Sequence, residues 1–183
     1  MYHDRIQESY LAAYHFAARA HGAQVYPGTE ISYIMHLSFV SMEVLAALAA
    51  EPGHDGVLAV QCAVLHDVLE DTPTSAQDVE AMFGPRVLAG VQALTKAADV
   101  PKAAAMADSL RRIQAQPDEV WMVKLADRVS NLQEPPAYWT APKCLAYQAE
   151  ARLILDALAP ASPYLAARLA QKIEAYGRWC VEG

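Results

Sequence analysis

Cysteine is scarce in this chain, and the spacing of its three cysteines does not suit a disulfide framework or a zinc site. Cys62, Cys144 and Cys180 are odd in number, lie far apart and form no CxxC pair. A disulfide framework needs paired cysteines and a zinc ribbon needs closely spaced pairs, so the sequence supports neither. Reduced cysteines are typical of the cytoplasm, where we expect this protein to reside.

Basic charge is also lacking. The 183 residues carry 14 Lys+Arg against 21 Asp+Glu, a formal net charge of −7, and no Lys/Arg-rich arm offsets it locally. Such a chain repels a polyanion, which argues against binding along a DNA or RNA polymer. A small anionic substrate is still possible if a metal ion receives it. The sequence indicates no oligomeric state.

Long apolar runs are missing as well. No segment offers about 18 uninterrupted apolar residues, and the start of the chain, from Met1 to Arg5, lacks the apolar core of a signal peptide. We therefore expect a soluble protein with no membrane association.

The chain is rich in alanine and in helical periodicity. Hydrophobic residues make up 54% of it and charged residues 19%, a balance that with so much alanine favours an all-α fold, here a single domain over 1–183. Thr74-Ser75-Ala76-Gln77 is typical of a capping box, and Ser162 is a second candidate helix cap. The periodicity and its Pro and Gly breaks predict helices over about 4–20, 36–50, 55–70, 102–114, 118–132, 143–158 and 163–181, with two short ones on either side of Gly84.

Two polar clusters interrupt this apolar pattern. The first is His66-Asp67 followed by Glu70-Asp71, which fall within six residues of an apolar helix. At i, i+4 spacing, His66 with Glu70 and Asp67 with Asp71 would form two adjacent rows facing one way. Carboxylates buried there without partners would be costly, and a bound cation would offset that cost.

The second cluster lies on another apolar helix and consists of residues at i+3 and i+4 spacing: Lys124, Asp127, Arg128 and Asn131. Taken singly, Asp127-Arg128 is most often an ordinary salt bridge, and a lone histidine such as His36 is most often a core or surface residue. The order of these residues along the chain and their place on apolar helices instead favour a metal site. A histidine, a His-Asp pair and a distant aspartate on buried helices give a His2Asp2 set, which suits Mn2+ or Fe2+ better than a structural zinc ion.

At this point the sequence resembles a known family, the HD hydrolases of the alarmone synthetase/hydrolase group, and in particular the small single-domain alarmone hydrolases. The resemblance covers about residues 15–135 and leaves the predicted helices over 143–181 as packing elements. Its motifs occur in the family's order and approximate spacing: Tyr33-Ile34-Met35-His36, Leu65-His66-Asp67-Val68-Leu69-Glu70-Asp71-Thr72, Phe83-Gly84, Leu94-Thr95-Lys96 and Val123-Lys124-Leu125-Ala126-Asp127-Arg128.

The resemblance implies a compact multi-helix HD-domain fold and Mn2+-dependent hydrolysis of the 3′-pyrophosphate of (p)ppGpp, as in the stringent response. The metal ligands it implies are His36, His66, Asp67 and Asp127. Glu70 and Asp71 match the carboxylate pair that positions or deprotonates the attacking water, and Asn131 matches a nucleotide contact. Lys124 is a further candidate for contacting the substrate. Another divalent transition metal remains an alternative.

One difference from the family concerns recognition of the nucleotide's purine base. After His21 and Gln24 relatives usually place an Arg-Lys pair that contacts the base, whereas this chain has Tyr26-Pro27. Tyr26 can stack on a purine without reading its edge, or simply pack the loop. Adenosine alarmones of the (p)ppApp type, another 3′-phosphorylated nucleotide, or a non-catalytic nucleotide-sensing role are therefore alternatives.

Two other groups of residues carry less weight. Arg111-Arg112 is a candidate for contacting a substrate phosphate, although such a pair on a helix is usually a solvated face. The three tryptophans, at positions 121, 139 and 179, are expected to pack in the core.

Overall fold

The computed structural model describes residues 2–180, and within them helices account for all the regular structure apart from one isolated bridge between Val25 and Ser32. The helices are α1 (Tyr2–His21), α2 (Ile34–Ala50), α3 (Gly56–Leu65), α4 (Val68–Asp71), α5 (Ala76–Phe83), α6 (Pro85–Leu94), α7 (Ala105–Gln114), α8 (Asp118–Asn131), α9 (Ala141–Leu158) and α10 (Pro163–Tyr176), with short 3-10 turns at Ala159–Ala161 and Gly177–Trp179. The predicted all-α HD-domain fold is confirmed. The predicted last helix over 163–181 is too long, because α10 ends at Tyr176 and a 3-10 turn follows it; residue 181 itself lies outside the described residues.

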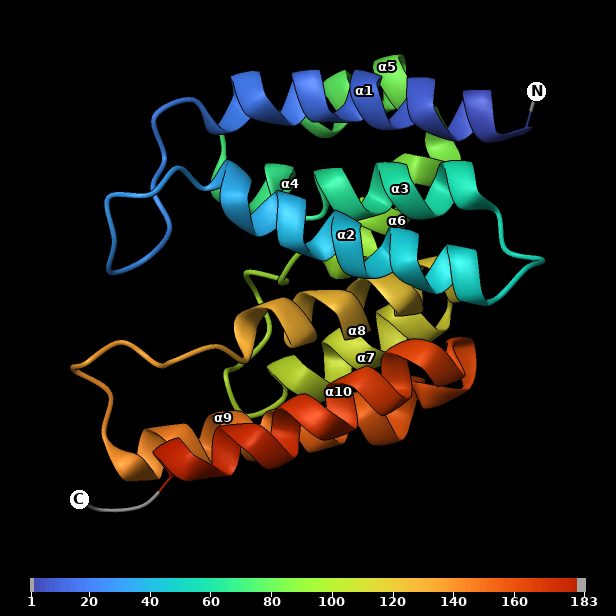
Figure 1. Ribbon diagram of the computed structural model, residues 1–183. Coiled ribbons are helices and arrows are strands. Elements are labelled where there is room, and N and C mark those ends of the chain that lie inside the picture. The colour runs from blue at the N-terminus through green and yellow to red at the C-terminus, as the bar shows by residue number, and fades with distance from the viewer. Residues whose placement is uncertain (1, 181–183) are drawn as a thin grey trace.

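The helices stack in layers, with α1 and α5 on one side, α2 and α3 below them, and α8, α9 and α10 on the other side (Figure 1). Helix α3 packs against α1, α2, α6 and α8, and all of its apolar side chains except the half-buried Val57 are buried. Because such a helix has no solvated face, its sequence reads as a nearly continuous apolar run. The central helices α2, α3 and α8 therefore position the polar clusters identified in the sequence.

Helix ends follow local hydrogen-bonding rules. Ser162 caps α10 by accepting the N–H of Leu165, as predicted. The predicted capping box at Thr74 and Gln77 is wrong by one residue, because Ser75 is the cap and its partner is Asp78. Thr74 is instead bonded through its hydroxyl to Thr72, which holds the turn before the helix.

The predicted continuous helix over 55–70 is also wrong, because it breaks between α3 and α4 at His66 and Asp67. The imidazole Nδ1 of His66 lies 2.8 Å from the carbonyl oxygen of Ala63, the acceptor that an unbroken helix would offer to the N–H of Asp67. His66 and Asp67 therefore turn together toward α2 and α8.

No helix among the described residues is long and apolar enough to cross a membrane.

Candidate functional site

The two histidines and two aspartates singled out in the sequence meet where α2, the α3–α4 junction and α8 converge. The Nε2 atoms of His36 and His66 lie 3.2 Å apart. Asp67 Oδ2 lies 2.9 Å from the His66 nitrogen and 3.5 Å from that of His36, and Asp127 Oδ1 lies 3.9 and 3.5 Å from the same two atoms. Both aspartate oxygens therefore approach one pair of imidazole nitrogens.

Hydrogen bonds on the outer side of each imidazole leave the inner nitrogen facing the cluster. His66 Nδ1 is bonded to the backbone of Ala63, and His36 Nδ1 lies 3.3 Å from the hydroxyl of Ser130. Such an outer bond fixes which ring nitrogen can face a metal ion. Nitrogen and carboxylate donors at this spacing are the ligands that a divalent transition ion takes.

The histidines and aspartates of the cluster shift one another's pKa values. Burial lowers the pKa of His36, but Asp127 and Asp67 outweigh it and raise the pKa to about 9. The pKa of His66 is raised despite its burial, chiefly by the charge of Asp67. Burial acts to raise the pKa of Asp67, yet His66 and His36 bring it well below its usual value. The site is therefore an anionic environment that favours a positive charge, whether protons or a cation.

A second set of donors surrounds Asp127. Lys124 Nζ donates to its Oδ2 at 3.0 Å, and the side-chain amide of Asn131 donates to its Oδ1 at 2.6 Å. The amide oxygen of Asn131 in turn accepts the hydroxyl of Tyr26 at 3.3 Å. The three residues predicted to contact substrate are thus linked to Asp127 in one hydrogen-bonded chain.

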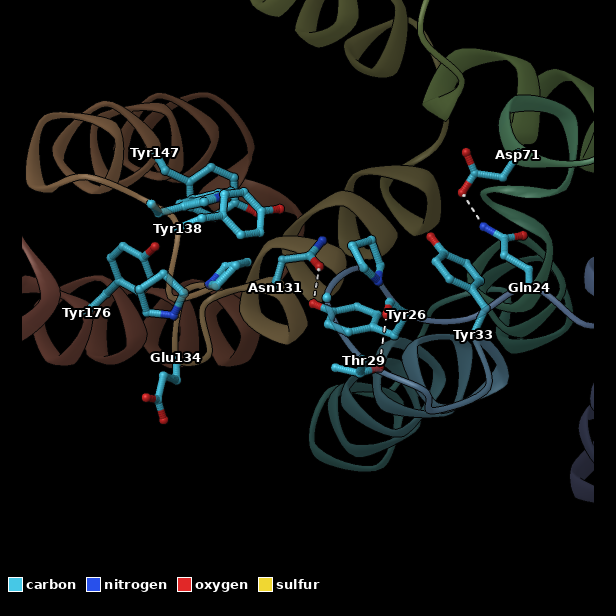
Figure 2. Close-up of a pocket in the computed structure, with 15 residues that line it drawn as sticks. Gln24, Tyr26, Thr29, Tyr33, Asp71, Asn131, Glu134, Tyr138, Tyr147 and Tyr176 are labelled. Atoms are coloured by element: carbon cyan, nitrogen blue, oxygen red, sulfur yellow. Dashed lines mark hydrogen bonds between the residues drawn. The ribbon is translucent and has the colours of Figure 1, made fainter.

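The candidate catalytic carboxylates Glu70 and Asp71 line the same cavity but have different hydrogen-bond partners. Glu70 accepts the backbone N–H of Lys96 at 3.0 Å and its ammonium at 2.5 Å. Asp71 accepts the side-chain amide of Gln24 at 3.3 Å (Figure 2). Both carboxylates line a cavity of about 500 Å³ that also contains the histidine–aspartate cluster.

A second cavity, of about 520 Å³, lies beside the first, and Figure 2 shows the residues that line it. The loop from Gln24 to Thr29 and the loop from Glu134 to Trp139 contribute to it, together with α9 and α10. Its aromatic lining is Tyr26, Tyr33, Tyr138, Trp139, Tyr147 and Tyr176. Tyr33, Asp71, Asn131 and Tyr147 line both cavities, so the two spaces adjoin. We call the first the metal-side cavity and the second the aromatic cavity.

All nine site residues predicted from the sequence line one or both of these cavities. Arg111 and Arg112 line neither, because both bind Asp108 and Arg112 also donates to the carbonyl oxygens of Gln92 and Ala93. The structure therefore gives no support to the phosphate contact suggested for them. Trp139 packs against the core as expected, but it also faces the aromatic cavity.

Sequence analysis missed several residues of the site. Tyr33 and Lys96 stand inside the quoted motifs, yet they received no role, although the hydroxyl of Tyr33 donates to Asp67 at 2.5 Å. Tyr147 lies on α9, outside the segment that resembles the family, and its ring lies under the guanidinium of Arg128 at 4.2 Å. Only the packing of α9 on α8 brings it to the site, so no local pattern could reveal it.

The fold and this cluster define an HD domain, and comparison with known families agrees: the chain belongs to the HD domain family, whose profile matches residues 13–160. Donor chemistry, buried imidazole nitrogens and flanking carboxylates all fit the divalent metal ion that an HD domain binds.

Several similar proteins are described as 3′-pyrophosphohydrolases, and others as GTP pyrophosphokinases. A guanosine-3′,5′-bis(diphosphate) 3′-pyrophosphohydrolase of Aquifex aeolicus is 33% identical over 69% of this chain, which spans only 18% of that relative. The enzyme MESH1 of Danio rerio, with the same description, is 31% identical over 75% of this chain and 77% of its own length. The solved structure of a metazoan ortholog of SpoT, described as hydrolysing ppGpp, superposes with a TM-score of 0.79 at 26% identity, covering 94% of this chain and 97% of that one.

Proposed function

We propose that this protein is a metal-dependent hydrolase that removes pyrophosphate from the 3′ position of a nucleotide alarmone of the (p)ppGpp type. The observation that carries the proposal is the shared cavity, in which the histidine–aspartate cluster and two further carboxylates face one space. The similar proteins described as 3′-pyrophosphohydrolases support the same reaction. Water breaks the bond between the 3′ oxygen and the diphosphate, so the products would be pyrophosphate and a nucleoside 5′-diphosphate or 5′-triphosphate.

In this proposal His36, His66, Asp67 and Asp127 hold the ion, which is Mn2+ or, as the alternative, another divalent transition metal that takes mixed imidazole and carboxylate donors. When bound, the ion supplies Lewis acidity and lowers the pKa of water. Glu70 or Asp71 then accepts the water proton on a carboxylate oxygen, since both line the cavity beside the cluster. Asn131, tied to Asp127 by its amide, orients the nucleotide.

The aromatic cavity is the proposed place for the base. Its tyrosine and tryptophan rings offer stacking surfaces next to the metal-side cavity, and Tyr26 is among them. C-terminal helices contribute two of these rings, Tyr147 on α9 and Tyr176 on α10. We therefore propose that the whole chain, and not only its motif-bearing part, works as one hydrolase unit.

Base selectivity is a second element of the proposal. Stacking tolerates both purines, and Pro27 has neither a side-chain donor nor a backbone N–H where relatives place a basic residue. We propose weak discrimination between ppGpp and ppApp, or a preference for ppApp. A small nucleotide in the cytoplasm is the proposed partner, with no nucleic-acid polymer. Three free, buried cysteines support a reducing location.

Product analysis after incubating the Mn2+-loaded protein with ppGpp and ppApp, and with NADPH as a phosphorylated nucleotide that is not an alarmone, tests the substrate class. Pyrophosphate released from an alarmone is expected, and binding without turnover would favour the nucleotide-sensing alternative. Comparing kcat/KM for ppGpp and ppApp in the same buffer tests selectivity. A preference for ppGpp above about 100-fold, some 2.7 kcal/mol, would contradict weak discrimination.

A further inference from the structure

Tyr33 makes a contact that the proposed reaction leaves unexplained. Its hydroxyl donates to Oδ2 of Asp67 at 2.5 Å. The same oxygen lies 2.9 Å from Nε2 of His66 and 3.5 Å from Nε2 of His36. The hydroxyl therefore fixes the one oxygen of Asp67 that faces both imidazole nitrogens.

The ring of Tyr33 has little freedom to move this hydroxyl away. It is only 7% exposed and stacks on His21, with ring centroids 4.9 Å apart and planes 23° from parallel. His21 is itself buried, and its Nδ1 is bonded to the side chain of Gln24 at 2.8 Å. The end of α1 thus holds the aromatic ring just before α2 begins, between Tyr26 and the Gln24–Asp71 pair (Figure 2).

The two aspartates of the cluster differ in the hydrogen-bond donors that hold their carboxylates. Asp127 receives Lys124 and Asn131, one on each carboxylate oxygen. Among residues 2–180, the Tyr33 hydroxyl is the single side-chain donor to Asp67 apart from the two histidines. Removing that hydroxyl would leave the Asp67 carboxylate with the two imidazoles as its remaining side-chain partners, whereas Asp127 would keep two further donors.

We propose that Tyr33 is a positioning residue that orients the carboxylate of Asp67 for metal binding. This role rests on the proposed metal site, in which Asp67 is a ligand. Partners that hold the ligands of a metal site typically contribute about 10- to 100-fold to metal affinity. A phenylalanine keeps the stacked ring and removes only the hydroxyl, so it isolates this contribution.

The test is a titration of the full-length protein with Mn2+, following the EPR signal of the free ion, with Tyr33→Phe and wild type side by side. Tyr14→Phe is the matched control, because it removes another tyrosine hydroxyl from the α1–α2 interface, where it is bonded to Ser38 at 3.0 Å. The Kd for Mn2+ should rise by about 10- to 100-fold in Tyr33→Phe and stay unchanged in Tyr14→Phe.

Equal Mn2+ affinity of Tyr33→Phe and wild type would overturn the proposal, and so would an equal loss in both variants. A Tyr33→Phe protein without a helical circular dichroism spectrum, beside a folded Tyr14→Phe, would overturn it too, since the hydroxyl would then serve the fold. As a second readout, kcat of Tyr33→Phe should recover at saturating Mn2+. The titration needs no substrate, so its outcome is separate from that of the proposed hydrolysis.

Discussion

At the scale of single residues, the two candidate catalytic carboxylates are held in different ways. Glu70 is paired with Lys96 through two donors, and Asp71 has one longer bond to Gln24. Neither is among the four residues proposed to bind the ion. Replacing either carboxylate should therefore affect the proton transfer more than metal affinity.

The variant Glu70→Gln tests this separation. We expect kcat to fall by about 10²- to 10⁴-fold, the usual contribution of a general base, with the Kd for Mn2+ unchanged. Steady-state kinetics and a Mn2+ titration on the same preparation measure the two quantities. Asp71→Asn is the matched comparison, and an unchanged kcat in Glu70→Gln together with a large loss in Asp71→Asn would move the role of base to Asp71.

The histidines give the metal-free protein a characteristic pH dependence. His36 has its pKa raised to about 9, above its ordinary value of 6.5, so its protonation stabilises the fold fully below about pH 6.5. That stabilisation is lost as pH rises through 9, and the pKa of His66 is shifted in the same direction. We expect the Tm in chelator to fall between pH 6.5 and 9, by about 2–4 °C per kcal/mol lost. A Tm that rises over this range would contradict the charge arrangement described.

At the scale of helices, close packing around α3 holds the site together. Gly90 on α6 faces α3 and α8, and a Cβ added there would lie 2.7 Å from the sulfur of Cys62 and 3.0 Å from a methyl group of Val120. Both neighbours are fully buried, so neither has space to move. Overpacking of this kind typically costs about 1–3 kcal/mol.

Gly90→Ala should therefore lower the free energy of unfolding by about 1–3 kcal/mol in denaturant titrations. Gln92→Ala is the control, because that side chain is exposed on the same helix and its removal should change stability by less than about 0.5 kcal/mol. Equal stabilities for Gly90→Ala and wild type would mean that α6 does not approach α3 as closely as described.

Helix packing also explains how much of the site could be predicted from the sequence. The order His36, His66-Asp67, Asp127 on apolar helices was sufficient to predict the cluster, since a buried polar group on such a helix needs a partner. The break at His66 could not be predicted from periodicity, because it depends on one side-chain bond to the carbonyl of Ala63. Tyr147 comes from the packing of α9, which is a tertiary contact with no local signal.

At the scale of the whole molecule, the proposed ion joins segments that are far apart in the chain. Its ligands come from α2, the α3–α4 junction and α8, and α8 also packs against α9 and α10. A ligand that binds only the folded state stabilises it by about 2.7 kcal/mol at 100 times its Kd. Mn2+ should therefore raise the Tm of wild type by about 5–10 °C at that concentration, by the same scaling of Tm with free energy. Asp127→Ala should show a much smaller shift, and equal shifts would place the ion elsewhere.

The proposed alarmone hydrolysis depends on the histidine–aspartate cluster. The most direct measurement is pyrophosphate release from ppGpp by wild type and Asp67→Ala, each with Mn2+ and with chelator, after circular dichroism has confirmed that both are folded. We expect release by wild type only in Mn2+, and none by Asp67→Ala or by either protein in chelator. Full release by Asp67→Ala, or by wild type in chelator, would contradict it.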